Sequence, residues 1–183
     1  MTPFHLIPQA LSLQDCADLV ALCAAAPKRD AGLVGGATAH QMRRADLVWL
    51  DDVPGAAWVM DRMLRLVAEA NRTAFDLDLT EFAESPQVAR YGADRQGHFD
   101  WHSDIGAGAL AAKRKLTIVV QLSAPDDYAG GTLDLWPDAN TRTVPRAQGL
   151  AVVFPSFVLH RVTPVTDGAR WSLTLWAHGP AFR

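Results

Sequence analysis

The second half of the sequence is divided into short extended segments by turn residues, and this pattern constrains the fold more than any other feature. The segments cover residues 87–91, 97–104, 116–123, 132–136, 150–154, 160–165 and 170–178. Between them lie turn signals such as Pro125-Asp126-Asp127 and Gly130-Gly131. Regularly spaced short strands separated by turns predict an antiparallel sandwich or barrel.

Two helices are expected before these strands. Residues 12–26 begin with the potential cap Ser12, carry apolar side chains at three- and four-residue spacing, and stop at Pro27. A second apolar stripe predicts a helix from Pro54 to about Arg72, and residues 43–50 between the two helices are expected to form a strand. Helices first and strands afterwards indicate an α+β fold with the helices packed outside the sheets, and 183 residues suit a single domain.

Charge and hydropathy narrow the classes of partner. The formal net charge is −3, which argues against the basic surface that nucleic acid or an anionic membrane would favour. The basic cluster Lys113-Arg114-Lys115 is expected to be a solvated strand end. No apolar run approaches the roughly 20 residues that a membrane span needs.

The two cysteines, Cys16 and Cys23, lie seven residues apart in the first predicted helix. That spacing corresponds to roughly 10 Å along a helix axis, which is too far for a disulfide. Buried, reduced thiols are expected. The apolar run at residues 19–26 has no preceding Lys or Arg, so a cytoplasmic location is favoured over secretion.

One segment carries an unusual density of metal-binding side chains. His98, Asp100, His102 and Asp104 alternate within residues 97–104, so a regular strand would place all four on one face. His160 ends a later apolar run. Two histidines and one carboxylate from separate strands can hold Fe(II) and leave three coordination positions open, although Zn or Ni suits the same ligands. Either His-x-Asp pair could supply ligands.

A buried cation is expected on the last strand. Alternation over residues 170–176 places Arg170, Ser172, Thr174 and Trp176 on one face. A guanidinium inside a barrel needs an anion, because a buried unpaired charge costs several kcal/mol. The planar fork of arginine fits a carboxylate, as a dicarboxylic cosubstrate would provide.

These features together resemble a known family. Tyr91 followed by residues 97–104, the segment 122–133 and the segment 154–170 are similar to motifs of the Fe(II)- and 2-oxoglutarate-dependent dioxygenases, in the prolyl-4-hydroxylase-like branch that includes the PKHD-type hydroxylases. The resemblance implies a double-stranded β-helix, or jelly-roll, core over residues 85–183 that carries the metal site. Residues 1–75 would supply the supporting helices and a first strand, within one domain over residues 1–183.

The resemblance also assigns roles to individual residues. It implies that His102, Asp104 and His160 are the catalytic iron ligands, and it selects this His-x-Asp pair over His98 and Asp100. Arg170 would bind the distal carboxylate of 2-oxoglutarate. The remaining candidates for contact with the cosubstrate are Tyr91, Gln121 and Thr174, and those for contact with the substrate are Arg43, Arg44 and Trp101.

The implied activity is hydroxylation of an unactivated C–H bond in an amino-acid, peptidyl, protein or small-molecule substrate. Fe(II), 2-oxoglutarate and O₂ would take part, with ascorbate as an optional addition, and succinate and CO₂ would be released. Two alternatives remain open: a jelly-roll zinc-dependent hydrolase, which leaves Arg170 unexplained, and a non-catalytic metal-binding module.

Overall fold

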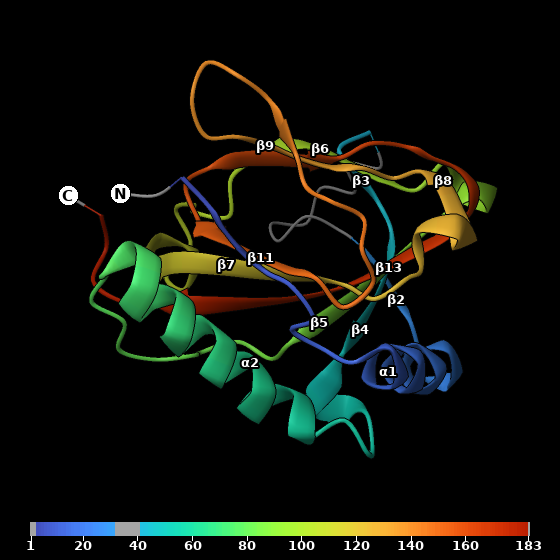
Figure 1. The fold of residues 1–183 in the computed structure, drawn as a ribbon, viewed down its shortest axis with the longest axis horizontal. Helices are drawn as coiled ribbons and strands as arrows, with labels where there is room; N and C mark the ends of the chain where they lie inside the picture. Colours follow the sequence, from blue (N-terminus) through green and yellow to red (C-terminus); the bar gives the residue numbers. More distant parts are fainter. Residues whose placement is uncertain (1–2, 32–40, 183) are drawn as a thin grey trace.

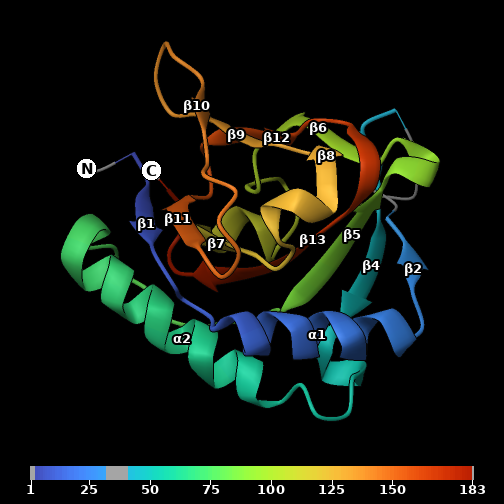
Figure 2. The same ribbon diagram turned by 45° about the vertical axis from the view of Figure 1, so that its right-hand side comes forward.

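Two antiparallel β-sheets face each other, and two helices cover the outside of the larger sheet (Figure 1; Figure 2). The computed structural model describes residues 3–31 and 41–182. The loop predicted around Gly32, Gly35 and Gly36 lies outside these residues. The arrangement is a double-stranded β-helix, and the predicted α+β jelly-roll class is confirmed.

The larger sheet lies next to the helices. In spatial order its strands are β1 (His5–Ile7), β11 (Ala151–Pro155), β7 (Arg114–Gln121), β13 (Val165–His178), β5 (Gln87–Gly92), β4 (Asp46–Trp49) and β2 (Arg29–Asp30), and β8 (Tyr128–Gly130) also pairs with β13. Every pairing is antiparallel. The long strand β13 therefore contacts three neighbours and spans the barrel from one end to the other.

The smaller sheet closes the opposite side of the barrel. Its strands, in spatial order, are β10 (Arg142–Thr143), β9 (Leu133–Trp136), β12 (Leu159–Val162), β6 (His98–His102) and β3 (Arg43–Arg44). Short 3₁₀ turns lie at Leu50–Asp52, Ala93–Arg95, Ala111–Lys113 and Pro125–Asp127. The sequence patterns did not indicate the short edge strands β1, β2, β8 and β10.

The first helix matches its prediction and the second begins later than predicted. Helix α1 (Leu13–Ala25) starts with a capping box in which Ser12 and Asp15 each bond the other's backbone. Helix α2 (Trp58–Ala70) starts four residues after Pro54, because Gly55 has a φ of +86° and a right-handed helix cannot pass through that conformation. A π-helical turn, η2 (Asn71–Phe75), follows α2.

The apolar core forms two layers. One lies between the helices and the larger sheet and contains Cys16, Cys23 and Met63, and the other lies between the two sheets. Both cysteines are buried and free, and burial raises the pKa of each thiol to about 11. The expected reduced thiols are therefore confirmed.

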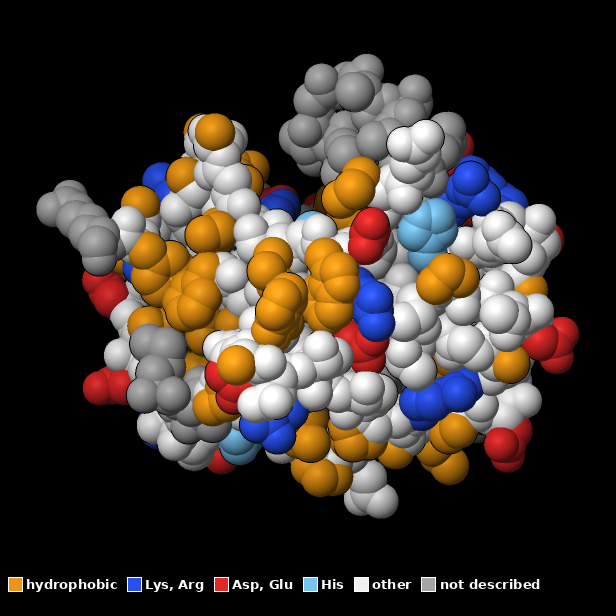
Figure 3. Space-filling view, turned by 90° about the horizontal axis from the view of Figure 1, so that it is seen from above, with side chains coloured by type: hydrophobic (Ala, Val, Ile, Leu, Met, Phe, Trp, Pro, Cys, Tyr) orange, Lys and Arg blue, Asp and Glu red, His pale blue; other side chains and the backbone are white. Residues whose placement is uncertain are grey.

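The outer face of the smaller sheet has no helix over it in Figures 1 and 2. Figure 3 views the molecule from this side and shows hydrophobic side chains gathered on the surface. The large exposed hydrophobic residues on β9, β12 and the turn before β12 are Trp136, Leu159 and Phe157.

Among the described helices, none combines the length and apolar character that a membrane crossing requires.

Candidate metal centre

A β-bulge in strand β6 decides which side chains of the histidine-rich segment face the barrel interior. His102 lies opposite His160 of β12, but Phe99 lies opposite Val162, so four residues of β6 span three of β12. As a result Phe99 and His102 point to the same side, with their rings stacked 3.4 Å apart.

The prediction that four alternating side chains share one face is therefore wrong. Strand β6 ends at His102, and Asp104 lies beyond it. His98 bonds the backbone carbonyls of Gln96 and Gln41, while Asp100 is exposed. Neither His98 nor Asp100 belongs to the metal-binding cluster found among the described residues.

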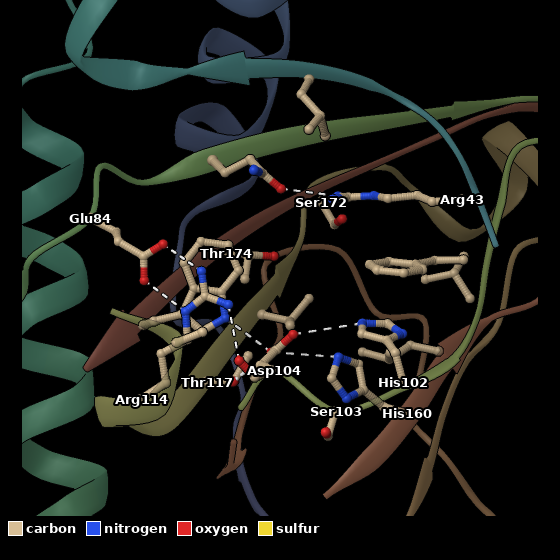
Figure 4. Close-up of a pocket in the computed structure, with 18 of the residues that line it drawn as sticks. Arg43, Glu84, His102, Ser103, Asp104, Arg114, Thr117, His160, Ser172 and Thr174 are labelled. Carbon is tan, nitrogen blue, oxygen red and sulfur yellow. Dashed lines mark hydrogen bonds and ion pairs between the residues drawn. The ribbon is translucent and has the colours of Figure 1, made fainter. Parts of the chain in front are cut away.

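His102, Asp104 and His160 converge on one point between the sheets (Figure 4). One ligand atom from each lies within 4.8 Å of the others, with His102 Nε2 3.7 Å from Asp104 Oδ1 and His160 Nε2 3.6 Å from Asp104 Oδ2. The Nδ1 atoms of the histidines bond the backbone carbonyls of Asp100 (2.7 Å) and Val158 (3.0 Å). Such bonds place the proton on Nδ1 and leave both Nε2 atoms free to bind a metal.

The electrostatics of the cluster favour the protonation states that a metal needs. Burial, reinforced by the neighbouring His160, lowers the pKa of His102 to about 3, so its imidazole is neutral. Burial alone would raise the pKa of Asp104, but the two imidazoles and two hydrogen-bond donors outweigh it and lower that pKa. Neutral imidazole and ionised carboxylate are the ligating forms.

Asp104 is held by groups from the larger sheet. The Thr117 hydroxyl of β7 donates to Asp104 Oδ2 at 2.7 Å, and the Trp176 indole N–H of β13 donates to the same oxygen at 3.0 Å. The Asp104 backbone N–H donates to the carbonyl of Ser156 at 2.9 Å. The alternation of residues 170–176 placed Trp176 on the correct face, but no sequence signal indicated Thr117.

A largely buried ion pair between Arg114 and Glu84 adjoins the metal-binding cluster. Arg114 donates through Nε to Glu84 Oε2 at 2.7 Å and through Nη2 to Glu84 Oε1, and its Nη1 donates to the backbone carbonyl of Asp104 at 3.0 Å. His178 Nε2 lies 2.9 Å from Glu84 Oε2. Burial alone would raise the pKa of Glu84, but its bonds to Arg114 and then His178 lower it. The expectation that Lys113-Arg114-Lys115 is a solvated strand end is wrong for two of its residues, because Arg114 is largely buried and Lys115 is buried, whereas Lys113 is exposed.

Arg170 is the largest fully buried side chain among the described residues and is 1% exposed. It donates to Gln121 Oε1 at 2.9 Å and weakly to Ser172 Oγ at 3.4 Å, and its Nε has no partner. The Tyr91 ring centroid lies 5.5 Å from the Arg170 guanidinium carbon, and no described carboxylate pairs with Arg170. Burial lowers the pKa of Arg170. Within the described part of the chain this guanidinium therefore has no anionic partner, which fits the expectation that it needs an anion from a bound molecule.

A cavity of about 300 Å³ connects these groups. Its walls include all three residues of the cluster together with Tyr91, Arg170 and Thr174, as predicted, and also Arg43. Gln121, Arg44 and Trp101 do not line it, but Gln121 accepts a hydrogen bond from Arg170, which does.

A jelly-roll barrel with two histidines and one aspartate in its interior has the ligand set that is typical of non-haem Fe(II) oxygenases. The donor set fits the metal, since imidazole and carboxylate suit Fe(II) and no described cysteine is nearby. The unpaired Arg170 in the same cavity fits a cosubstrate that carries a second carboxylate.

Comparison with known proteins agrees with this class. Residues 86–178 match the model of the 2OG-Fe(II) oxygenase superfamily. A PKHD-type hydroxylase of Delftia acidovorans is 29% identical over 94% of this chain and 76% of its own length, and one of Cupriavidus metallidurans is 39% identical over 39% of this chain and 32% of its own length. The crystal structure of a Pseudomonas putida prolyl-4-hydroxylase is 26% identical with a TM-score of 0.77, over 97% of this chain and 93% of that one.

The chain belongs to the 2OG-Fe(II) oxygenase superfamily, in its PKHD-type, prolyl-4-hydroxylase-like branch. The predictions of a 2-oxoglutarate-dependent hydroxylase and of Fe(II), 2-oxoglutarate and O₂ as its reactants are confirmed at the level of this class. The zinc hydrolase and the non-catalytic module are not favoured. Ascorbate stays a prediction.

Proposed function

We propose that the protein hydroxylates an unactivated C–H bond of an amino-acid, peptidyl, protein or small-molecule substrate and converts 2-oxoglutarate to succinate and CO₂. One observation carries this proposal: the buried Arg170, which lacks an anion, shares a cavity with the His102–Asp104–His160 cluster. Neither a zinc-dependent hydrolase nor a non-catalytic metal-binding module would require a buried cation beside the metal.

The roles of the metal-binding residues follow from their contacts. His102 and His160 would bind Fe(II) through Nε2, with each ring orientation fixed by a backbone carbonyl. Asp104 would bind through Oδ1, because Thr117 and Trp176 already occupy Oδ2. When bound, iron supplies the O₂ and redox chemistry that protein side chains lack.

The other residues bind and orient the cosubstrate. Arg170 would bind its distal carboxylate, and Gln121 would position Arg170 by accepting from Nη2. Tyr91 and Thr174 also line the cavity and would help to restrict the cosubstrate to one pose. The cavity is at the small end for a ligand site, so a bound cosubstrate would leave room for only one small substrate.

The relatives support a substrate with an amino-acid unit. The Pseudomonas putida neighbour is a prolyl-4-hydroxylase, and the neighbour from Trichoplax adhaerens is a prolyl hydroxylase in complex with a peptide fragment. The latter is 18% identical to this chain, so it shows a shared fold alone.

An anaerobic titration tests the proposal. Fe(II) followed by 2-oxoglutarate should produce a weak visible charge-transfer band in the wild type, and His160→Ala should abolish it. Arg170→Gln should weaken 2-oxoglutarate binding about 10-fold or more, because a charge-assisted pair is lost. Its melting temperature should not fall, since the substitution removes an unpaired buried charge.

Arg142→Gln is the matched control. Arg142 is an exposed arginine of β10 that pairs with Asp138 and does not line the cavity. The absence of a band in the wild type, or an undiminished band in His160→Ala, would contradict the proposed function. Succinate formation under air then confirms turnover.

A further inference from the structure

Arg43 is a second cavity cation that the proposed chemistry does not use. It comes from strand β3, at the edge of the smaller sheet, and it lines the same cavity as the metal-binding cluster. The one side-chain hydrogen bond that it makes within the described residues goes from Nη2 to Gln87 Oε1 at 3.0 Å. Its Nε is buried and has no partner. A neutral amide orients a guanidinium but does not neutralise it.

The other charged groups of the cavity, once iron and 2-oxoglutarate are bound, balance one another. Glu84 is paired with Arg114. A divalent iron and Arg170 together balance Asp104 and the two carboxylates of 2-oxoglutarate, three positive charges against three negative ones. The remaining charged side chain in the lining is Arg43. The loaded cavity therefore keeps one positive charge, which favours an anionic group on whatever enters next.

The position of this cation is fixed relative to the metal. The guanidinium carbon of Arg43 lies 4.5 Å from the centre of the Phe99 ring, and Phe99 stacks on His102 at 3.4 Å. In Figure 4 Arg43 extends above the labelled His102, on the same side of the cavity. Packing against Phe99 and the hydrogen bond to Gln87 hold the Arg43 guanidinium in place, and only the Phe99 ring separates it from the metal ligand His102. A cation at this position could bind a substrate and orient it toward the metal.

We propose that Arg43 binds the α-carboxylate of the primary substrate, so that the substrate is a free amino acid or a close analogue with a free carboxylate. This inference rests on the proposed function and names its substrate class. A peptide bond has no charge to offer at this position, and it would leave the half-buried Arg43 side chain without a counter-charge at a cost in binding. The cavity, at about 300 Å³, suits one small substrate beside the cosubstrate.

Binding measurements test the proposal without relying on turnover. The anaerobic protein loaded with Fe(II) and 2-oxoglutarate is titrated calorimetrically with the common L-amino acids, each as the free acid and as the primary amide. At least one free acid should bind about 10-fold or more tightly than its amide, the difference expected from one charge-assisted hydrogen-bonded pair.

Variants then assign the difference to one residue. Arg43→Gln should remove the preference for the acid, Arg43→Lys should keep part of it because the charge remains without the planar fork, and Arg142→Gln should keep all of it. The charge-transfer band of 2-oxoglutarate should be unchanged in every variant, which shows that metal and cosubstrate still bind.

Three results would overturn the inference while leaving the proposed function intact. The first is equal affinity for acids and amides, the second is an unchanged preference in Arg43→Gln, and the third is binding of blocked peptides but of no free acid. A missing charge-transfer band in the wild type would instead overturn the proposed function itself.

Discussion

The hydrogen bonds to Asp104 Oδ2 should contribute measurably to metal affinity. Trp176 donates to this oxygen from β13 and Thr117 donates from β7. Trp176→Phe removes the indole N–H but keeps an aromatic ring beneath the Arg114 guanidinium, which lies 4.1 Å from the present ring centroid. Iron binding should weaken, because the carboxylate loses a donor that holds its orientation.

The size of the effect follows from the surroundings of the carboxylate. The Asp104 side chain is 9% exposed, so water cannot replace a lost donor freely. A hydrogen bond to a charged group contributes about 1.5–3 kcal/mol, which corresponds to a loss of roughly 10- to 100-fold in affinity. Thr117→Val should have a similar effect. The double variant should lose less than the product of both, since the two donors share one oxygen.

Trp171→Phe is the matched control. Trp171 lies on the same strand, β13, but packs against the core between the sheet and the helices. Competition between the protein and a chelator for Fe(II), measured anaerobically, gives the affinity, and thermal melting of the metal-free protein shows that each variant folds.

The reasoning would be refuted if Trp176→Phe and Thr117→Val both bound Fe(II) as tightly as the wild type while remaining folded. Equal losses in Trp171→Phe and Trp176→Phe would also refute it, because the effect would then follow from repacking rather than from the lost N–H.

Two further predictions concern buried titratable groups. The pKa of Glu84 is lowered in the folded state, so its stabilising contribution is fully present above its unfolded pKa, about 4.3, and is lost progressively as the pH falls from there through the lower folded pKa. Glu84→Gln should therefore cost about 1–3 kcal/mol of unfolding free energy near pH 7 and much less near pH 3, measured by urea titration; an equal cost at both pH values would contradict this. Burial raises the pKa of Cys16 and Cys23 to about 11, so neither thiol should react with a thiol reagent near pH 7 until denaturant is added, and rapid labelling of the native protein would contradict their burial.

The central strands were predictable because local patterns coincide with tertiary placement there. Alternation over residues 170–176 predicted which side chains of β13 face the barrel, and Arg170, Ser172, Thr174 and Trp176 all line the cavity. The cap at Ser12 likewise depends on atoms within one helical turn. Such features need no information from distant segments.

The errors lie where distant segments decide the outcome. The bulge in β6 depends on how that strand pairs with β12, and the alternation of residue types along the β6 sequence does not indicate where a bulge lies. Arg114 was expected in solvent because a basic triplet is usually solvated, yet Glu84, thirty residues earlier, supplies the buried partner. Short edge strands such as β10 have only two residues and carry no period at all.

The metal centre lies at the junction of the two sheets, and this explains why its residues are scattered along the chain. His102 and His160 come from the smaller sheet, whereas the donors that hold Asp104 come from β7 and β13 of the larger one. Asp104 itself follows the end of β6 and is fixed by contacts with the opposite sheet. The ligand geometry therefore depends on both sheets being packed together, so metal affinity and barrel closure are coupled. Bound iron would stabilise the closed barrel by an amount that grows with the logarithm of the iron concentration once that concentration exceeds Kd.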